Sequence, residues 1–157
     1  MDNYYSRRMF LGQLKKSFLY NTSRLGFRIF NFDIQPYPTV SAIIVKGGKI
    51  LTIKVSKDHY TLPGGMLKGQ ESFEDGLKRE VFEETGLYIG ILKLQGQYAF
   101  KKIYPTINLT YFAKVIKGKL KPSPEGKPIW LKANKIIDKL IYLDNKAAIK
   151  EYLEKKR

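Results

Sequence analysis

Runs of hydrophobic and β-branched residues alternate with short glycine- or proline-containing breaks along the middle of the chain. The predicted strands span residues 39–46, 49–55, 87–100, 106–116 and 129–131. Gly47-Gly48 separates the first two runs, which is the composition and spacing of a β-hairpin. Part of the 106–116 run alternates apolar and polar positions, as a half-buried strand does. A β-sheet is therefore predicted to begin near residue 39.

A helical period replaces this pattern after residue 72. Ser72, followed three residues later by Asp75, predicts a helix N-terminus, and Gly86 predicts its end. The apolar positions between them recur with helical spacing and would pack the helix on the sheet: Phe73, Leu77 and Val81. Two more helices are predicted over residues 134–140 and 144–155.

Residues 1–38 have a pattern of their own and are interpreted as a basic amphipathic N-terminal extension ahead of a domain at 39–157. This segment carries six bases and two acids and ends at Pro36-Tyr37-Pro38. A helix is predicted after Ser6 by apolar residues spaced four apart, and residues 25–32 have strand-like composition. The alternatives are an extra helix and strand packed on the main fold, a homodimerisation arm, a substrate lid and a nucleic-acid-binding patch.

Composition limits the chemistry. A chain of 157 residues is long enough for one domain. It contains no cysteine and a single histidine, His59, which argues against thiolate or histidine-rich metal sites and a Ser-His-Asp triad. No apolar run reaches the ~18 to 20 residues of a membrane span. Residues 6–11 resemble a twin-arginine signal, but the polar residues after them interrupt the apolar segment such a signal needs, so a cytoplasmic location is predicted.

Charge is distributed unevenly. Twenty-nine bases against fourteen acids give a net charge of +15, which favours encounters with polyanions. Six of the fourteen acids nevertheless lie within residues 71–84, which contain only two bases. Such a concentration of negative charge in a basic protein predicts neutralisation by bound cations.

The predicted helix carries most of this acidic cluster. Glu80, Glu83 and Glu84 are at positions i, i+3 and i+4, so their carboxylates share one face. Oxygen ligands grouped in this way suit hard cations such as Mg²⁺ or Mn²⁺. The alternative is a solvated acidic face balanced by neighbouring lysines.

A motif surrounds these glutamates. From Gly65 the chain reads Gly, five residues, Glu71, seven residues, Arg79-Glu80-Val81, Phe82, Glu83-Glu84, Thr85, Gly86-Leu87. This pattern resembles the complete Nudix box, and residues 60–64 are similar to the strand and turn that usually precede it. The resemblance implies an α/β Nudix fold, in which a mixed β-sheet is sandwiched between α-helices, here with the N-terminal helical and strand segment added. It also implies Mg²⁺-dependent hydrolysis of a nucleoside diphosphate linked to another group.

The resemblance also assigns roles to residues. Glu80, Glu83 and Glu84 match the metal-binding and base-supplying glutamates, and Gly64 matches a glycine whose carbonyl can bind metal. The other matching positions support the glutamates and the loop that precedes them: Arg79, which orients glutamates, and Gly65 and Glu71, which support the loop.

Residues outside the box receive weaker assignments. Glu125, in a loop 41 residues past Glu84, is similar in placement to a distal glutamate that some members use as ligand or base, so the base is either Glu80 or Glu125. The alternative role for Glu125 is that of a solvated loop carboxylate. His59 and Tyr104 are candidate substrate contacts, and Phe82 is expected to pack against a terminal helix.

Three functions follow from these observations. The first is a pyrophosphohydrolase acting on a small nucleotide: a nucleoside triphosphate, an ADP-ribose-like compound or a dinucleoside polyphosphate. The second places the same chemistry at the 5′ end of RNA, which the basic surface would bind. The third is a non-catalytic Nudix-fold binding or regulatory module, which would require a degraded box, whereas this box is intact. A small nucleoside diphosphate derivative is the predicted substrate, with no membrane partner.

Overall fold

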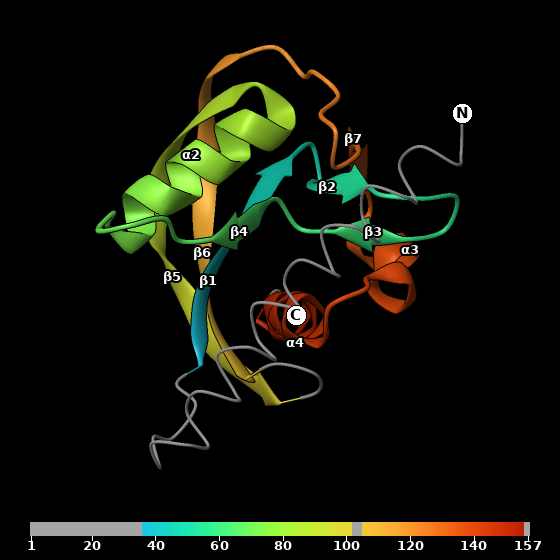
Figure 1. Ribbon diagram of the computed structural model, residues 1–157. Coiled ribbons are helices and arrows are strands. Elements are labelled where there is room, and N and C mark those ends of the chain that lie inside the picture. The colour runs from blue at the N-terminus through green and yellow to red at the C-terminus, as the bar shows by residue number, and fades with distance from the viewer. Residues whose placement is uncertain (1–35, 102–104, 156–157) are drawn as a thin grey trace.

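The computed structural model describes residues 36–101 and 105–155 (Figure 1). The predicted N-terminal helix and strand, and with them the dimerisation arm, lie outside the described residues, as does Tyr104. The elements are β1 (Tyr37–Lys46), β2 (Lys49–Lys54), β3 (Tyr60–Thr61), β4 (Gly64–Met66), α2 (Phe73–Thr85), β5 (Leu87–Lys101), β6 (Pro105–Gly118), β7 (Lys127–Leu131), α3 (Ala133–Ile136), the 3₁₀ turn η1 (Ile137–Lys139) and α4 (Leu143–Glu154).

The strands form one mixed sheet, as predicted. Its main path runs β3-β2-β1-β6-β5, with β4 paired to β1 and β7 paired to β2. Strands β1 and β6 are parallel, whereas β5 and β6 form a long antiparallel pair. The predicted hairpin is confirmed by the antiparallel pairing of Lys46 with Lys49 across Gly47-Gly48.

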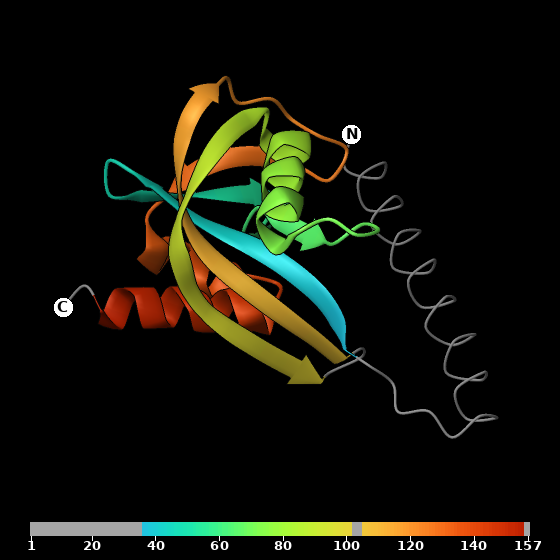
Figure 2. The same cartoon turned by 90° about the vertical axis from the view of Figure 1, so that its left-hand side faces the viewer.

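Helices cover both faces of this sheet (Figure 2). Alternate residues of β1 point to opposite sides, as the two-residue period of a strand requires. One face forms a core with α2: Val40, Ala42, Ile44, Leu77 and Val81. The other face forms a core with α3, η1 and α4: Ile43, Ile50, Ile136, Leu140, Ala148 and Ile149. The sheet sandwiched between helices is therefore confirmed.

Element ends differ slightly from the prediction. Strands β1 and β7 each begin two residues earlier than expected, at Tyr37 and Lys127, because prolines are compatible with extended backbone there. The single helix predicted over 134–140 is instead a short α-helix followed by the 3₁₀ turn. Its N-terminus has no side-chain cap, and the consecutive β-branched Ile136 and Ile137 have low helix propensity. No helix within the described ranges is long and apolar enough to cross a bilayer.

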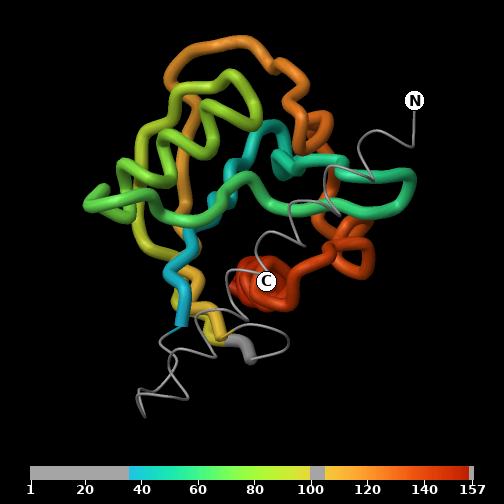
Figure 3. Tube along the Cα trace, in the orientation of Figure 1, coloured from blue at the N-terminus to red at the C-terminus, as the bar shows by residue number. Residues whose placement is uncertain are grey.

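The chain after β6 connects the two sides of the candidate site. It passes over α2 and returns to the sheet at β7 (Figure 3). The Lys121 amide donates to the Thr85 carbonyl oxygen, with N and O 2.9 Å apart, which fixes this segment to the C-terminal end of α2. A loop that starts far from the acidic helix in sequence is thereby brought back to it.

Candidate active site

Helix α2 begins and ends where the sequence predicts. The Ser72 side chain accepts a hydrogen bond from the Asp75 amide at 3.1 Å, so it caps the helix. At the other end Gly86 has the left-handed conformation, and its amide donates to the Phe82 carbonyl oxygen. These local signals hold the helix in one register and so fix which glutamates face the sheet.

Strand β4 brings its backbone close to two glutamates of α2, Glu80 and Glu84. Gly64 has a φ of 146°, a conformation that side chains rarely adopt, and its amide donates to Glu84 Oε2 at 2.8 Å. A Cβ atom at Gly65 would lie 2.7 Å from the Glu80 carboxyl carbon. Gly65 therefore allows an approach between β4 and α2 that a larger residue would prevent, whereas a Cβ atom at Gly64 would collide with the Val40 carbonyl oxygen of β1.

A buried asparagine of α4 anchors the chain that leads to Gly64. Asn145 Oδ1 accepts hydrogen bonds from the Leu62 amide and the Thr61 hydroxyl, each at 2.9 Å. The next residue, Pro63, accepts a bond from the Ala42 amide of β1. The α4 helix and the central strand thus jointly position the glycine turn.

Arg79 organises the acidic residues around it. Its guanidinium donates to Glu71 in a bidentate pair, to Glu80 Oε1 at 2.7 Å, and to the Met66 carbonyl oxygen at 3.1 Å. The same group forms a longer contact with Glu83 Oε2 at 3.4 Å. Arg79 therefore joins α2 to the loop after β4 and contacts the carboxylates of both segments.

Protonation of these groups follows from their surroundings. The hydrogen bonds of Arg79 hold the pKa of Glu71 down at about 2, and the Lys68 amide lowers it further. In return, Glu71 and Glu80 raise the pKa of Arg79. Burial raises the pKa of Glu80 despite its contact with Arg79. The Glu71 carboxylate is therefore ionised at neutral pH, whereas Glu80 binds its proton more tightly than an exposed glutamate.

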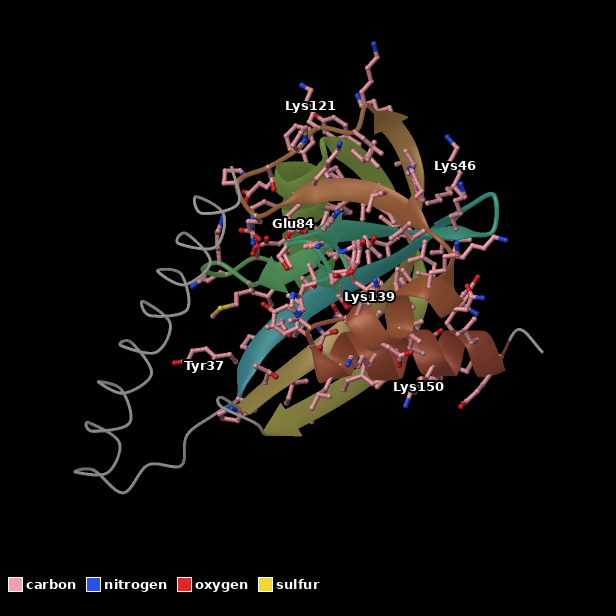
Figure 4. The ribbon with its side chains drawn as sticks, turned by 90° about the vertical axis from the view of Figure 1, so that its right-hand side faces the viewer. Tyr37, Lys46, Glu84, Lys121, Lys139 and Lys150 are labelled. Atoms are coloured by element: carbon pink, nitrogen blue, oxygen red, sulfur yellow. The ribbon has the colours of Figure 1, made fainter. Side chains whose placement is uncertain are left out.

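Glu84 is more deeply buried than Glu80, with only 3% of the residue exposed. It lies inside the molecule, whereas Lys46, Lys121 and Lys150 project from the surface (Figure 4). Burial raises its pKa well above the usual value, and a hydrogen-bonding contact with the Glu125 carboxyl raises it further. The structure therefore brings Glu125 close to Glu84 of α2.

A tight turn holds Glu125 there. Ser123 and Gly126 exchange backbone hydrogen bonds, and the Ser123 hydroxyl accepts a third from the Glu125 amide at 3.2 Å. Glu125 itself is exposed, so its carboxyl group can reach both solvent and Glu84. Its position also raises the pKa of Glu80 through charge repulsion.

These residues suit a hard divalent cation. The Glu84 and Glu125 carboxyl groups interact while Glu84 is almost fully buried, so they repel each other when both are ionised, and a cation between them would replace repulsion by attraction. Within residues 36–101 and 105–155, no three acidic or histidine side chains already converge as a metal cage. The donors are carboxylate and carbonyl oxygens, the chemistry that Mg²⁺ and Mn²⁺ prefer.

The other candidates are placed differently. His59 lies exposed in the turn between β2 and β3, and its Nδ1 pairs with the Ser56 hydroxyl at 2.8 Å, so no described contact links it to the glutamates. Glu83 is on the solvent side of α2, where Lys68 and Arg79 pair with it. The expectation that Phe82 packs on a terminal helix is wrong for α4, and the predicted N-terminal helix lies outside the described residues.

Phe82 instead contacts Tyr88 of β5, with ring centroids 4.6 Å apart. It cannot reach α4 because the sheet lies between the two helices (Figure 2).

Two residues at the start of α4 were missed from the sequence. The hydroxyl of Tyr142 has its pKa raised by burial and by the charges of Asp144, Glu125 and Glu84, which places it near the carboxylates. Burial also raises the pKa of Asp144. The Tyr142 residue as a whole remains about half exposed. The only signal was a hydrophobic run that ends in an acid, Ile141 to Asp144, and runs of this kind are common at the starts of helices that carry no site.

The fold and site together define a hydrolase in which carboxylates on a helix face a glycine turn. Comparison with known proteins agrees. The NUDIX domain family model matches residues 36–152. An ADP-ribose pyrophosphatase of Methanocaldococcus jannaschii is 31% identical over 131 residues, which cover 79% of this chain and 77% of that protein. An 8-oxo-dGTP diphosphatase of Buchnera aphidicola is 38% identical over 78 residues, covering 46% of this chain and 58% of that protein.

A solved structure has the same fold. A NUDIX hydrolase from Nitrosomonas europaea superposes with a TM-score of 0.69 at 24% identity, covering 78% of this chain and 92% of that one. The chain belongs to the Nudix hydrolase family, and it is an enzyme that acts on phosphoric anhydrides.

Proposed function

We propose that this enzyme cleaves the diphosphate linkage of a small nucleoside diphosphate derivative with the help of Mg²⁺ or Mn²⁺. The observation that carries the proposal is the contact between the buried Glu84 carboxyl and the Glu125 carboxyl beside a glycine turn. Two neighbouring carboxylates would repel a diphosphate, so substrate binding there requires a cation.

Each residue of the candidate site has a proposed role. Glu84, Glu125 and the Gly64 carbonyl are the proposed ligands, and Glu83 completes the set from the exposed edge of α2. A bound divalent cation would neutralise the diphosphate and acidify water. Arg79 keeps the carboxylates in place through the contacts described above, and Glu71 keeps Arg79 in place.

Glu80 is the proposed general base. Its Oε1 is occupied by Arg79, which orients the group, and its raised pKa makes it a better proton acceptor than an ordinary glutamate. Glu125, which is exposed and in contact with Glu84, is proposed as a ligand. Exchanging these two roles is the alternative.

The substrate we favour is an ADP-ribose-like compound. A relative whose match covers 79% of this chain is named for ADP-ribose. Tyr142, a half-exposed residue near the carboxylates, could stack its ring on a nucleobase while the diphosphate lies at Glu84 and Glu125. The second candidate is an oxidised nucleoside triphosphate, supported by the relative named for 8-oxo-dGTP.

A substrate panel tests this proposal. ADP-ribose, 8-oxo-dGTP, ordinary nucleoside triphosphates, dinucleoside polyphosphates and a triphosphorylated oligoribonucleotide would be incubated with the enzyme and Mg²⁺, and products separated by chromatography. We expect AMP and ribose phosphate from ADP-ribose with the highest kcat/KM. A kcat/KM about tenfold higher for the oligoribonucleotide than for every small nucleotide would contradict the proposal.

A further inference from the structure

A long part of this chain contains no acidic residue. Between Glu84 and Glu125 there are 40 residues with seven lysines and no aspartate or glutamate. They form β5, β6 and the segment that follows β6. Strand β5 is the outermost strand of the main sheet path, so this hairpin forms one side of the molecule. Its lysines therefore have no acidic partner on their own strands.

Two aromatic rings are exposed beside this hairpin. Phe82 of α2 and Tyr88 of β5 are 43% and 47% exposed, and their ring centroids lie 4.6 Å apart at an interplanar angle of 37°. The Lys117 Nζ atom lies 4.9 Å from the centroid of the Tyr88 ring, a cation–π contact between cross-strand partners. A cation is thus held over a ring that is itself open to solvent.

More lysines follow along the same edge. Lys119 and Lys121 are exposed, and both lie close to Gly86 at the end of α2, where Lys121 is fixed through its amide. None of Lys117, Lys119 and Lys121 forms an ion pair with an acid in the described ranges. Figure 4 shows Lys121 projecting away from the body of the protein. The positive charge of this edge is therefore uncompensated.

We propose that Phe82, Tyr88, Lys117, Lys119 and Lys121 form a binding surface for single-stranded nucleic acid. We call these five residues the aromatic–lysine surface. Aromatic faces stack on unpaired bases of any sequence, and lysines spaced along an edge hold the phosphates between them. A duplex hides its base faces and would leave both rings unused. An acidic peptide would pair with the lysines but offer no flat partner for the rings.

The aromatic–lysine surface adjoins the candidate active site. The segment carrying Lys119 and Lys121 continues to the turn that holds Glu125 against Glu84. A strand bound on the aromatic–lysine surface would therefore have the candidate active site next to it. The proposal does not depend on the identity of the small substrate, because none of the five residues belongs to the proposed ligand set.

The test measures binding of a short labelled oligouridylate to the full chain by fluorescence anisotropy over a range of KCl concentrations. The triple variant Lys117→Gln/Lys119→Gln/Lys121→Gln should bind at least about tenfold more weakly, with a log–log salt slope shallower by about 2, as expected for three lost phosphate contacts. Phe82→Leu/Tyr88→Leu should lower affinity at least about fivefold without changing the slope, since stacking releases no counterions.

A matched control removes the same charge elsewhere. Lys132→Gln/Lys135→Gln/Lys150→Gln changes three exposed lysines near and on α3 and α4, and Lys150 projects from the side of the molecule opposite Lys121 in Figure 4. This variant should bind within about twofold of the wild type. Circular dichroism and hydrolysis of the best small nucleotide should be unchanged in all three variants, which shows that each is folded.

Several results would overturn the proposal. Equal losses in both triple variants would mean that net charge alone attracts the strand. Equal affinity for a duplex, or equally effective competition by polyglutamate and polyuridylate, would remove the role of the rings. Absence of wild-type binding at low salt would reject the surface outright, and none of these outcomes would alter the small-nucleotide result.

Discussion

At the scale of single residues, Glu84 should control how the stability of the metal-free protein responds to pH. Its pKa is raised above the ordinary 4.5 by burial and by Glu125, so the folded state holds the proton more tightly than the unfolded chain. Its contribution to the free energy of unfolding is therefore present at low pH and is lost as pH rises from 4.5 towards the raised pKa. Glu84→Gln should remove this loss.

Thermal denaturation with a chelator, from about pH 5 to about pH 8, tests this expectation. Relative to the wild type, Glu84→Gln should gain melting temperature as pH rises, whereas the exposed-site control Glu154→Gln should follow the wild type. A constant difference between Glu84→Gln and the wild type at all pH values would show that Glu84 does not titrate abnormally.

Glu71 should show the opposite dependence. Arg79 lowers the pKa of this carboxyl to about 2, so its contribution to stability is complete above the ordinary 4.5 and is lost as pH falls from 4.5 to 2. Glu71→Gln should therefore unfold at a lower urea concentration than the wild type near neutral pH, and the difference should shrink as pH approaches about 2. A difference that persists unchanged in acid would contradict the ion-pair explanation.

The pH–rate profiles of variants at Glu80 and Glu125 distinguish which of the two residues is the general base. If Glu80 is the base, Glu80→Gln should lower kcat at least about 10²-fold and remove the acidic limb of the profile. Glu125→Gln should keep that limb, lower the rate and weaken metal affinity, with an unchanged or higher melting temperature because repulsion on Glu84 is relieved. Loss of the limb only in Glu125→Gln would reverse the assignment, and an unchanged rate would make Glu125 a solvated loop residue.

At the scale of elements, the approach of β4 to α2 should depend on Gly65. A methyl group there would lie 2.7 Å from the Glu80 carboxyl, which Arg79 holds in place, so Gly65→Ala should displace the carboxylate. We expect a loss of kcat of at least about 10²-fold with a much smaller change in melting temperature. Gly90→Ala is the control, since its added methyl group would meet only side-chain atoms of Ile116 and Lys114, at 3.4 Å or more.

Helix α2 was predicted correctly because its signals are local. The Ser72 cap, the apolar stripe and Gly86 all lie within the helix or next to it. The hydrogen bonds of a helix also join residues that are only a few positions apart in the sequence. The pairing of the strands in the sheet was harder to predict from the sequence. Strand β4 pairs with β1 residues far away in sequence, and its three residues carry no strand pattern. Only the resemblance to the Nudix box indicated that Gly64 and Gly65 approach the helix.

At the scale of the whole molecule, the site is assembled from segments that no short pattern connects. Glu125 is returned to Glu84 by the loop over α2, and its spacing along the chain gave only an analogy to other family members. Tyr142 lies near the carboxylates because α4 is fixed to the glycine turn through Asn145. Such tertiary contacts depend on packing and were therefore missed from the sequence.

The central claim is that carboxylates around Glu84 hold a divalent cation for diphosphate hydrolysis. The most direct measurement is the rate of nucleoside monophosphate release from the best substrate of the panel as Mg²⁺ is titrated, for the wild type and Glu84→Gln. The wild-type rate should rise to saturation with Mg²⁺ and vanish with chelator, and Glu84→Gln should be at least about 10³-fold slower at every concentration. A wild-type rate that survives chelation, or near-wild-type turnover by Glu84→Gln at saturating Mg²⁺, would contradict it.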